Sequence, residues 1–267
     1  MILPVWKPDL KQLELCLKSL IDQTYENIEI VISYRKSGNL DSEFHELIRK
    51  FNDSRIKIVE SDLQGFTNAL NEGIQNTTGK LIARIDADDY CDITRFEKQL
   101  EFKRKTNSDI VGSWAYSISH FGEKIGKIEL PVTHNQIRKN MMLHCPLLHP
   151  SLLLDKKIFS EIGTYDPLFI HAEDYEFYFR AMSKNYKFGN VPEYLVYIRE
   201  DPHSRSRGVE WKTQRKYYMK SKNLAFFKYG FRNFYDVFYY LFSPISYFIS
   251  PKIAYRIKRF TGWYKTN

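Results

Sequence analysis

The sequence has little cysteine, no long hydrophobic run and no repeat. Its three cysteines, Cys16, Cys91 and Cys145, are odd in number and lack the spacing of metal ligands. This argues against a disulfide framework or a zinc site and indicates free thiols in a reducing compartment. The longest uncharged stretch near the end, Val237 to Pro251, has 15 residues and includes Pro244. A membrane-spanning helix needs about 20 apolar residues, so this stretch is too short to span a bilayer.

Charge is unevenly distributed along the 267 residues. The net charge is +8, with 43% hydrophobic and 27% charged residues, an ordinary composition for a globular protein that can bury a full core. From Arg199 to the end there are 15 Lys and Arg against 4 Asp and Glu, whereas the first 198 residues carry 25 and 28. A basic, aromatic C-terminal part indicates an anionic surface as its partner. No nucleic-acid-binding module is recognisable, so we expect no nucleic acid partner.

A cluster of carboxylates follows one predicted strand. The apolar run that begins at Leu81 reads as a buried strand and ends at Asp86, Asp88 and Asp89. In an extended Asp-x-Asp the two side chains fall on one face, so both can approach one ion. Hard oxygen ligands suit Mg²⁺ or Mn²⁺, which can in turn hold a diphosphate. A solvated acidic turn is the alternative, and the strand before the cluster together with the motifs after it favours the ion site.

Strand and helix patterns alternate, which indicates an α/β protein with a doubly wound sheet. Strands are expected at 2–6, 29–32, 56–59, 110–114, 127–130, 146–154 and 193–198, and helices at 10–21, 41–51, 65–76, 95–105, 158–162 and 171–184. Ligands of such sheets bind beyond the carboxyl ends of the strands, where Trp6, Tyr34 and Asp86 to Asp89 should converge. The first strand is short, so it begins at Met1 or the natural chain starts a few residues earlier. No secretory signal is expected ahead of it.

Taken in order, these motifs resemble the family 2 glycosyltransferases, inverting enzymes of the GT-A fold. The resemblance implies a mixed sheet flanked by helices. It covers a catalytic domain over 1–206, with a nucleotide-sugar half (1–105) and an acceptor half (106–206), ahead of a helical segment over 207–267. The matching pieces are Leu3-Pro4-Val5-Trp6, Ser19-Leu20 with Gln23-Thr24-Tyr25, Glu29 to Ile32, Asn68 to Ile74, Gly79 to Asp89, Arg95 with Gln99, Glu173-Asp174 and His203.

The resemblance implies roles for the carboxylates. Asp86 and Asp88 would hold a Mn²⁺ or Mg²⁺ ion that bridges the donor diphosphate, with Asp88 the closer ligand, and Asp174 would be the general base. A sugar hydroxyl is a poor nucleophile, so a carboxylate must take its proton as it attacks the anomeric carbon. The ion neutralises the charge that collects on the departing nucleoside diphosphate. Glu173 and Asp174 could instead serve only to cap a helix.

Other residues have two interpretations each. Trp6 is expected to stack on the nucleobase, with plain core as the alternative. His203 is a third metal ligand, a donor to the diphosphate or a surface residue. Arg84 is a buried ion-pair partner or a donor contact. The remaining candidates are Pro4, Tyr34 and Arg35 for the nucleotide-sugar, and Glu173 and His149 for the acceptor side.

One segment departs from the family pattern. Where the family usually carries an Asp pair that recognises uracil, this chain has Ser33-Tyr34-Arg35-Lys36-Ser37, without a carboxylate. The base is then read through backbone groups, or the donor is not a uridine nucleotide, or activity is impaired. The Gln-x-x-Arg-Trp signature of processive synthases is also absent, because the segment Thr213 to Tyr217 does not match it. This favours addition of a single sugar.

The predicted function is transfer of a sugar from a nucleotide-diphosphate-sugar to a glycan or lipid-linked acceptor, in surface-polysaccharide biosynthesis. The predicted location is cytoplasmic, peripheral on the inner face of the cell membrane. Residues 207–267 are expected to lie in the lipid headgroup region, or to pack against the catalytic domain or a second subunit of a homodimer. The alternative function is a non-catalytic nucleotide-sugar-binding or scaffold protein of the same fold.

Overall fold

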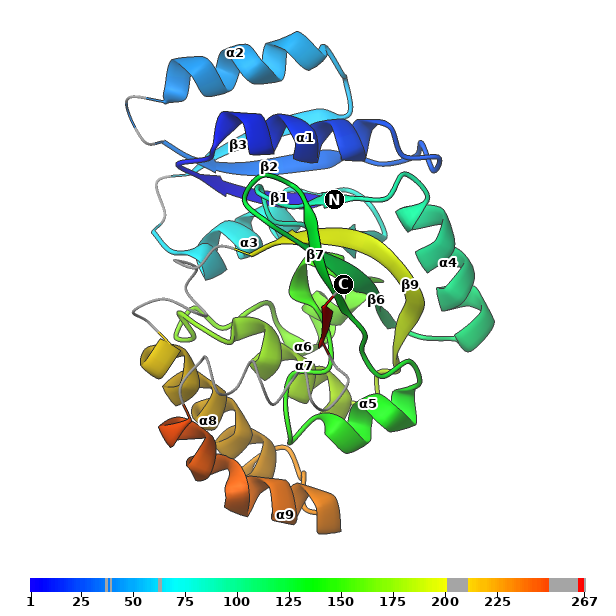
Figure 1. Cartoon of the computed structure of the whole chain (residues 1–267), viewed down its shortest axis with the longest axis vertical. Coiled ribbons are helices and arrows are strands. Elements are labelled where there is room, and N and C mark those ends of the chain that lie inside the picture. Colours follow the sequence, from blue (N-terminus) through cyan, green and yellow to red (C-terminus); the bar gives the residue numbers. More distant parts are fainter. Residues whose placement is uncertain (37, 39, 62–63, 201–210, 250–263, 267) are drawn as a thin grey trace.

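The computed structural model describes residues 1–36, 38, 40–61, 64–200, 211–249 and 264–266. Its N-terminal half contains three parallel strands in the order β1 (Ile2–Trp6), β2 (Ile30–Arg35) and β3 (Ile56–Ser61), joined by α1 (Leu10–Ile21) and α2 (Asp41–Phe51). These two helices cover one face of the strands, and α3 (Phe66–Gln75) covers the other (Figure 1). Strand alternation explains this arrangement, because Leu3 and Val5 pack with α1 and α2 while Ile2 packs with α3.

The remaining strands form a mixed sheet. Its order is β10 (Tyr264–Thr266), β7 (Lys124–Ile128), β6 (Ile110–Ile118), β8 (Leu153–Asp155) and β4 (Leu81–Ala83), and β9 (Phe188–Arg199) pairs with both β6 and β5 (Tyr90–Cys91). A single bridge between Ile2 and Arg84 links this sheet to β1. The sheet is flanked by α4 (Arg95–Thr106), α5 (His134–Asn140), α6 (Lys157–Ile162) and α7 (Glu173–Ser183). This is the GT-A fold, as predicted. The strand expected over 146–154 is instead a short 3₁₀ helix, His149–Ser151, ahead of β8.

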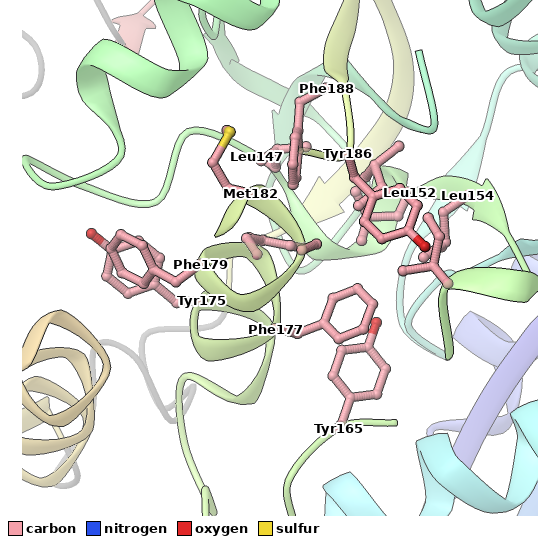
Figure 2. Close-up of a cluster of buried hydrophobic side chains, with 14 of the residues drawn as sticks. Leu147, Leu152, Leu154, Tyr165, Tyr175, Phe177, Phe179, Met182, Tyr186 and Phe188 are labelled. Atoms are coloured by element: carbon pink, nitrogen blue, oxygen red, sulfur yellow. The ribbon is translucent and has the colours of Figure 1, made fainter. Parts of the chain in front are cut away.

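The described C-terminal helices pack against α7. They are α8 (Trp211–Phe227), α9 (Phe234–Phe242) and a 3₁₀ helix, Ser243–Phe248, at the end of the molecule opposite α2 (Figure 1). Phe231 between the two helices is buried, and its ring meets Phe179 of α7 edge-on at 4.9 Å. Figure 2 shows Phe177 beside Tyr165 on one side of α7, with Tyr175 and Phe179 together on the other. The described helices of the C-terminal part therefore share the core around α7. Within the described ranges, no helix is long and apolar enough to cross a membrane.

A buried ion pair fixes α9. The carboxylate of Asp236 is fully buried and accepts two hydrogen bonds, of 2.8 and 2.7 Å, from Nη1 and Nη2 of Arg138 on α5. Asp236 also forms a capping box with Asn233 at the start of α9. The Arg138 guanidinium lies 4.1 Å from the ring centre of Phe231. One arginine thus holds both the helix and the connection that leads to it.

We expect Arg138→Ala to destabilise the protein by about 3–5 kcal/mol, because it leaves the Asp236 carboxylate buried without its partner. Equilibrium unfolding in urea measures this loss. The matched control is the double variant Arg138→Met with Asp236→Leu, which removes both charges and should lose less than the single variant. A single variant as stable as the wild type would contradict the inferred role of the pair.

Candidate active site

A pocket of about 370 Å³ lies at the carboxyl ends of the N-terminal strands, where the doubly wound topology predicts it. Five predicted donor-side residues line it, namely Pro4, Trp6, Arg35, Asp86 and Asp88. The lining also includes Ser33, Ser61 and Phe66, from β2, β3 and the start of α3. The structure thus brings residues from four separate segments of the sequence to one cavity.

Trp6 is the aromatic wall of this pocket. It is 52% exposed at the end of β1, which excludes the plain-core alternative. Arg35 Cζ and Lys7 Nζ lie 5.0 and 5.1 Å from the centre of its rings. Both distances are within the range of cation–π attraction, so two positive charges flank the indole.

Tyr34 does not line the pocket, contrary to the prediction that it contacts the nucleotide. Its side chain is fully buried, its ring stacks on Phe44 of α2 at 3.7 Å, and its hydroxyl donates to Asp41 Oδ1 at 2.6 Å. Side chains alternate along a strand, so Ser33 and Arg35 face the pocket while Tyr34 faces α2. Arg35, the other residue of this segment that was predicted to contact the nucleotide-sugar, does line the pocket.

Three carboxylates gather at the end of the acidic strand. Ligand oxygens of Asp86, Asp88 and Asp89 all lie within 4.8 Å of one another. Arg199 at the end of β9 fixes this turn: its backbone N–H donates to Asp89 Oδ1 at 2.8 Å, and its Nε donates to the Asp88 carbonyl at 3.0 Å. The sequence analysis placed Asp89 in the cluster but gave it no role, and it gave none to Arg199. The clamp joins residues 110 positions apart, which sequence spacing does not reveal.

The cluster lacks sufficient positive charge of its own. Asp88 is exposed at the pocket, but the protein atoms crowded around its carboxylate, together with the charge on Asp86, raise its pKa to about 6. Burial, followed by the charges on Asp86 and Asp88, raises the pKa of Asp89 well above its usual value. Carboxylates that repel one another in this way are stabilised by a cation, and an all-oxygen set suits Mg²⁺ or Mn²⁺. The residues present therefore fit a divalent ion.

The acceptor-side candidates meet at the start of α7. Ala172 has φ +57°, a left-handed turn that leads directly into Glu173 and Asp174. Glu173 is buried with Oε1 3.7 Å from Nδ1 of His149, whose Nε2 lies 3.0 Å from the Tyr165 hydroxyl. Burial, together with the charge on Arg84, lowers the pKa of His149 well below its usual value, so the imidazole is neutral. The structure thus brings Glu173 and His149 into one buried polar group.

Asp174 lies within electrostatic reach of the aspartate cluster. Burial raises its pKa, the N–H of Tyr175 and the charge on Arg84 oppose the rise, and the charge on Asp86 adds to it. The Tyr175 N–H donates to Asp174 Oδ1 at 2.8 Å. A carboxyl with a raised pKa has the character of a proton acceptor. Asp174 is not among the residues that line the pocket. His203 lies outside the described residues, so its role as a third ligand stays a prediction.

We expect Asp88→Asn to raise the melting temperature of the ion-free protein at pH 7. The folded protein holds the Asp88 proton up to about pH 6, whereas the ordinary value is 3.8. The folded state therefore binds more protons than the unfolded chain between these values and loses stability as pH rises through them. Asparagine avoids this loss.

Thermal melts with a chelator at pH 4 and pH 7 measure the effect, which should be larger at pH 7. Added Mn²⁺ should stabilise the wild type but not Asp88→Asn, because the variant lacks a carboxylate at this position. A variant that melts below the wild type at pH 7 without the ion would contradict the proposed cause of the raised pKa.

Known proteins share both the sequence pattern and the fold. The amylovoran biosynthesis glycosyltransferase AmsE of Erwinia amylovora is 30% identical over 199 residues, which cover 72% of this chain and 71% of AmsE. This chain matches 59% to 76% of the length of four curated relatives, one of which is AmsE. S. aureus TarS 1–349, solved with UDP-GlcNAc, superposes with a TM-score of 0.70 at 16% identity, over 96% of this chain and 74% of that one.

A second solved structure carries a different nucleotide. The mannosyltransferase PcManGT of Pyrobaculum calidifontis, in complex with GDP-Man and Mn²⁺, superposes with a TM-score of 0.63 at 14% identity, over 84% of this chain and 63% of that one. At such identities these two likenesses show the fold. Residues 2–163, more than half of the chain, match the family described as Glycosyl transferase family 2. The chain therefore belongs to glycosyltransferase family 2 and is a glycosyltransferase.

Proposed function

We propose that this glycosyltransferase uses a divalent ion, Mn²⁺ or Mg²⁺, to transfer one sugar from a nucleotide-diphosphate-sugar with inversion. The observation that carries the proposal is the aspartate cluster in a pocket walled by an exposed tryptophan, within electrostatic reach of Asp174. The bound nucleotides and Mn²⁺ in the TarS and PcManGT structures support this choice of donor and ion.

The proposed mechanism assigns one task to each group. Trp6 would stack on the base, and Asp86 and Asp88 are the residues that would hold the ion. When bound, the ion offsets the charge that develops on the departing nucleoside diphosphate. Asp174 takes the proton of the acceptor hydroxyl as its oxygen attacks the anomeric carbon. Glu173 and His149 border the acceptor side of the site.

The proposed acceptor is a glycan or lipid-linked saccharide in surface-polysaccharide biosynthesis. AmsE acts in amylovoran biosynthesis, which supports a polysaccharide product. The alternative, a non-catalytic nucleotide-sugar-binding protein, draws its support from the missing carboxylate beside Arg35. Release of nucleoside diphosphate from a panel of nucleotide-sugars, with and without Mn²⁺, separates the two, because a binding protein would be stabilised by a donor without turning it over.

We expect Asp174→Asn to lower kcat by roughly 10²–10⁴-fold, because the amide cannot accept the acceptor proton. Donor binding, measured by calorimetry, should stay within a few-fold of the wild type. The matched control is Asp22→Asn, at the exposed C-terminal cap of α1 and outside the pocket lining, which should leave the rate unchanged. Full activity of Asp174→Asn would remove Asp174 from the role of base.

The outer face of α9 is a second proposed contact, with an anionic membrane surface. Phe234, Phe238, Leu241 and Ile245 are exposed and follow one another at helical spacing of three and four residues. The buried Asp236 anchors the opposite side of the helix. An exposed apolar stripe in a strongly basic part of the chain suits the headgroup region of anionic lipids. Such peripheral attachment at the cytoplasmic face would keep enzyme and lipid-linked acceptor in one plane.

Sedimentation with vesicles containing phosphatidylglycerol tests this contact. We expect the wild type to bind, binding to weaken with added salt, and Phe238→Ser with Leu241→Ser to lose most of it. The matched control is Phe121→Ser, at the tip of the β6–β7 turn, whose side chain is 88% exposed. Sedimentation equilibrium without lipid tests the homodimer. If the wild-type protein does not bind the vesicles and instead forms dimers that the two serine substitutions disrupt, the stripe is a contact with a second subunit.

A further inference from the structure

Arg84 is a buried cation at the junction of the two sheets. Its backbone is held on three sides: its N–H donates to the Leu152 carbonyl at 3.1 Å, its own carbonyl accepts from Arg95 Nη2 at 2.9 Å, and it bridges to Ile2. Its side chain is only 3% exposed. The sequence analysis left it open whether Arg84 is an ion-pair partner or a donor contact, and the structure pairs it with Asp86.

The side chain of Arg84 does not line the pocket itself but contacts two residues that do, Asp86 and Phe66. Nη2 donates to Asp86 Oδ1, and Cζ lies 5.2 Å from the ring centre of Phe66, which also lines the pocket. This hydrogen bond uses Oδ1 of Asp86, and Oδ2 of the same carboxylate takes no part in it. Among the described residues, Nε and Nη1 of Arg84 are buried and have no hydrogen-bond partner. Buried guanidinium groups normally satisfy their N–H groups, so this side chain is kept at a cost in stability.

The charge of Arg84 acts on both halves of the site. Burial disfavours the charged form, but the negative groups around it, first Asp86, then Tyr165 and Asp89, and last Glu173, outweigh burial and raise its pKa, so Arg84 stays charged. Its charge in turn opposes the rise in the pKa of Asp174. The guanidinium therefore lies within electrostatic reach of the ion-binding aspartates and of the acidic pair that begins α7.

We propose that Arg84 is a positioning residue for the ion: its bond to Asp86 fixes the orientation of that carboxylate. This inference rests on the proposed function, which supplies the ion. Partners that orient a metal-binding carboxylate typically contribute 10–100-fold to metal affinity. An ion pair with a purely structural role would instead stabilise the fold and leave ion affinity unchanged.

The test measures Mn²⁺ binding to the ion-free protein by calorimetry, with no nucleotide present. We expect Arg84→Gln to weaken Mn²⁺ binding roughly 10–100-fold. Arg84→Lys keeps the charge but loses the planar fork, so it should recover part of the affinity. It also serves as the test variant if the glutamine variant does not fold.

The matched control is Arg180→Gln. Arg180 on α7 is also largely buried and bonds Glu176 at 2.8 Å, but Glu176, unlike Asp86, lies outside the pocket lining and is not a proposed ion ligand. We expect this variant to lose stability and to bind Mn²⁺ as the wild type does. Wild-type affinity in both Arg84 variants would overturn the inference and leave the proposed function intact. A wild type that binds no Mn²⁺ would instead contradict the ion site on which both rest.

Discussion

The structure depends on the mutual repulsion of carboxylates confined to the end of one strand. Oxygens of Asp86, Asp88 and Asp89 lie within 4.8 Å of one another, and the pKa values of Asp88 and Asp89 are raised. Two arginines oppose the repulsion from different directions: Arg84 pairs with Asp86 from beneath, and Arg199 bonds the backbone of Asp88 and the carboxylate of Asp89 from β9. The raised pKa of Asp88 indicates that these two cations do not neutralise the cluster, which fits the divalent ion proposed above.

The residues around the cluster also link the three-stranded sheet to the mixed sheet. The bridge from Ile2 to Arg84 joins the N-terminal strands to the mixed sheet immediately before Asp86. Arg199, the last residue of β9, bonds the turn that carries Asp88 and Asp89. Its Nη1 also donates to the carbonyls of Ser119 and His120 in the β6–β7 turn. The cluster is therefore held by both sheets. The helix that carries Asp174 is supported in turn by Phe231, beyond α8, so the C-terminal helices contribute to the position of the proposed base.

Features governed by local pattern could be predicted from the sequence, and those governed by distant contacts could not. The alternation of strands and helices placed Trp6 and Asp86 at one sheet edge, because topology alone fixes where parallel strands end. The predicted contact between Tyr34 and the nucleotide was wrong, because position along a strand does not show which face of the sheet a side chain occupies until the neighbouring helix is known. The Arg199 clamp and the Arg138–Asp236 pair join residues about 100 positions apart. The composition of residues 207–267 did not reveal which face of α9 packs inward.

The departure at Arg35 bears on which nucleotide the pocket accepts. A uracil ring offers an imide N–H between two carbonyls, and the N–H needs an acceptor. Beside Trp6 the described lining places Lys7 and Arg35, which only donate. The nearest additional carboxylate in the lining is Asp9, and its Oδ1 already accepts the N–H groups of Lys11 and Gln12 at the start of α1. The two cations beside Trp6 suit a base edge that carries acceptors. A uracil N–H would have to bond a backbone carbonyl, the remaining oxygen of Asp9, or a side-chain oxygen of Gln12, Ser33 or Ser61, which also line the pocket. If the donor is a uridine nucleotide, its base would therefore be bound without the carboxylate pair that the family usually carries.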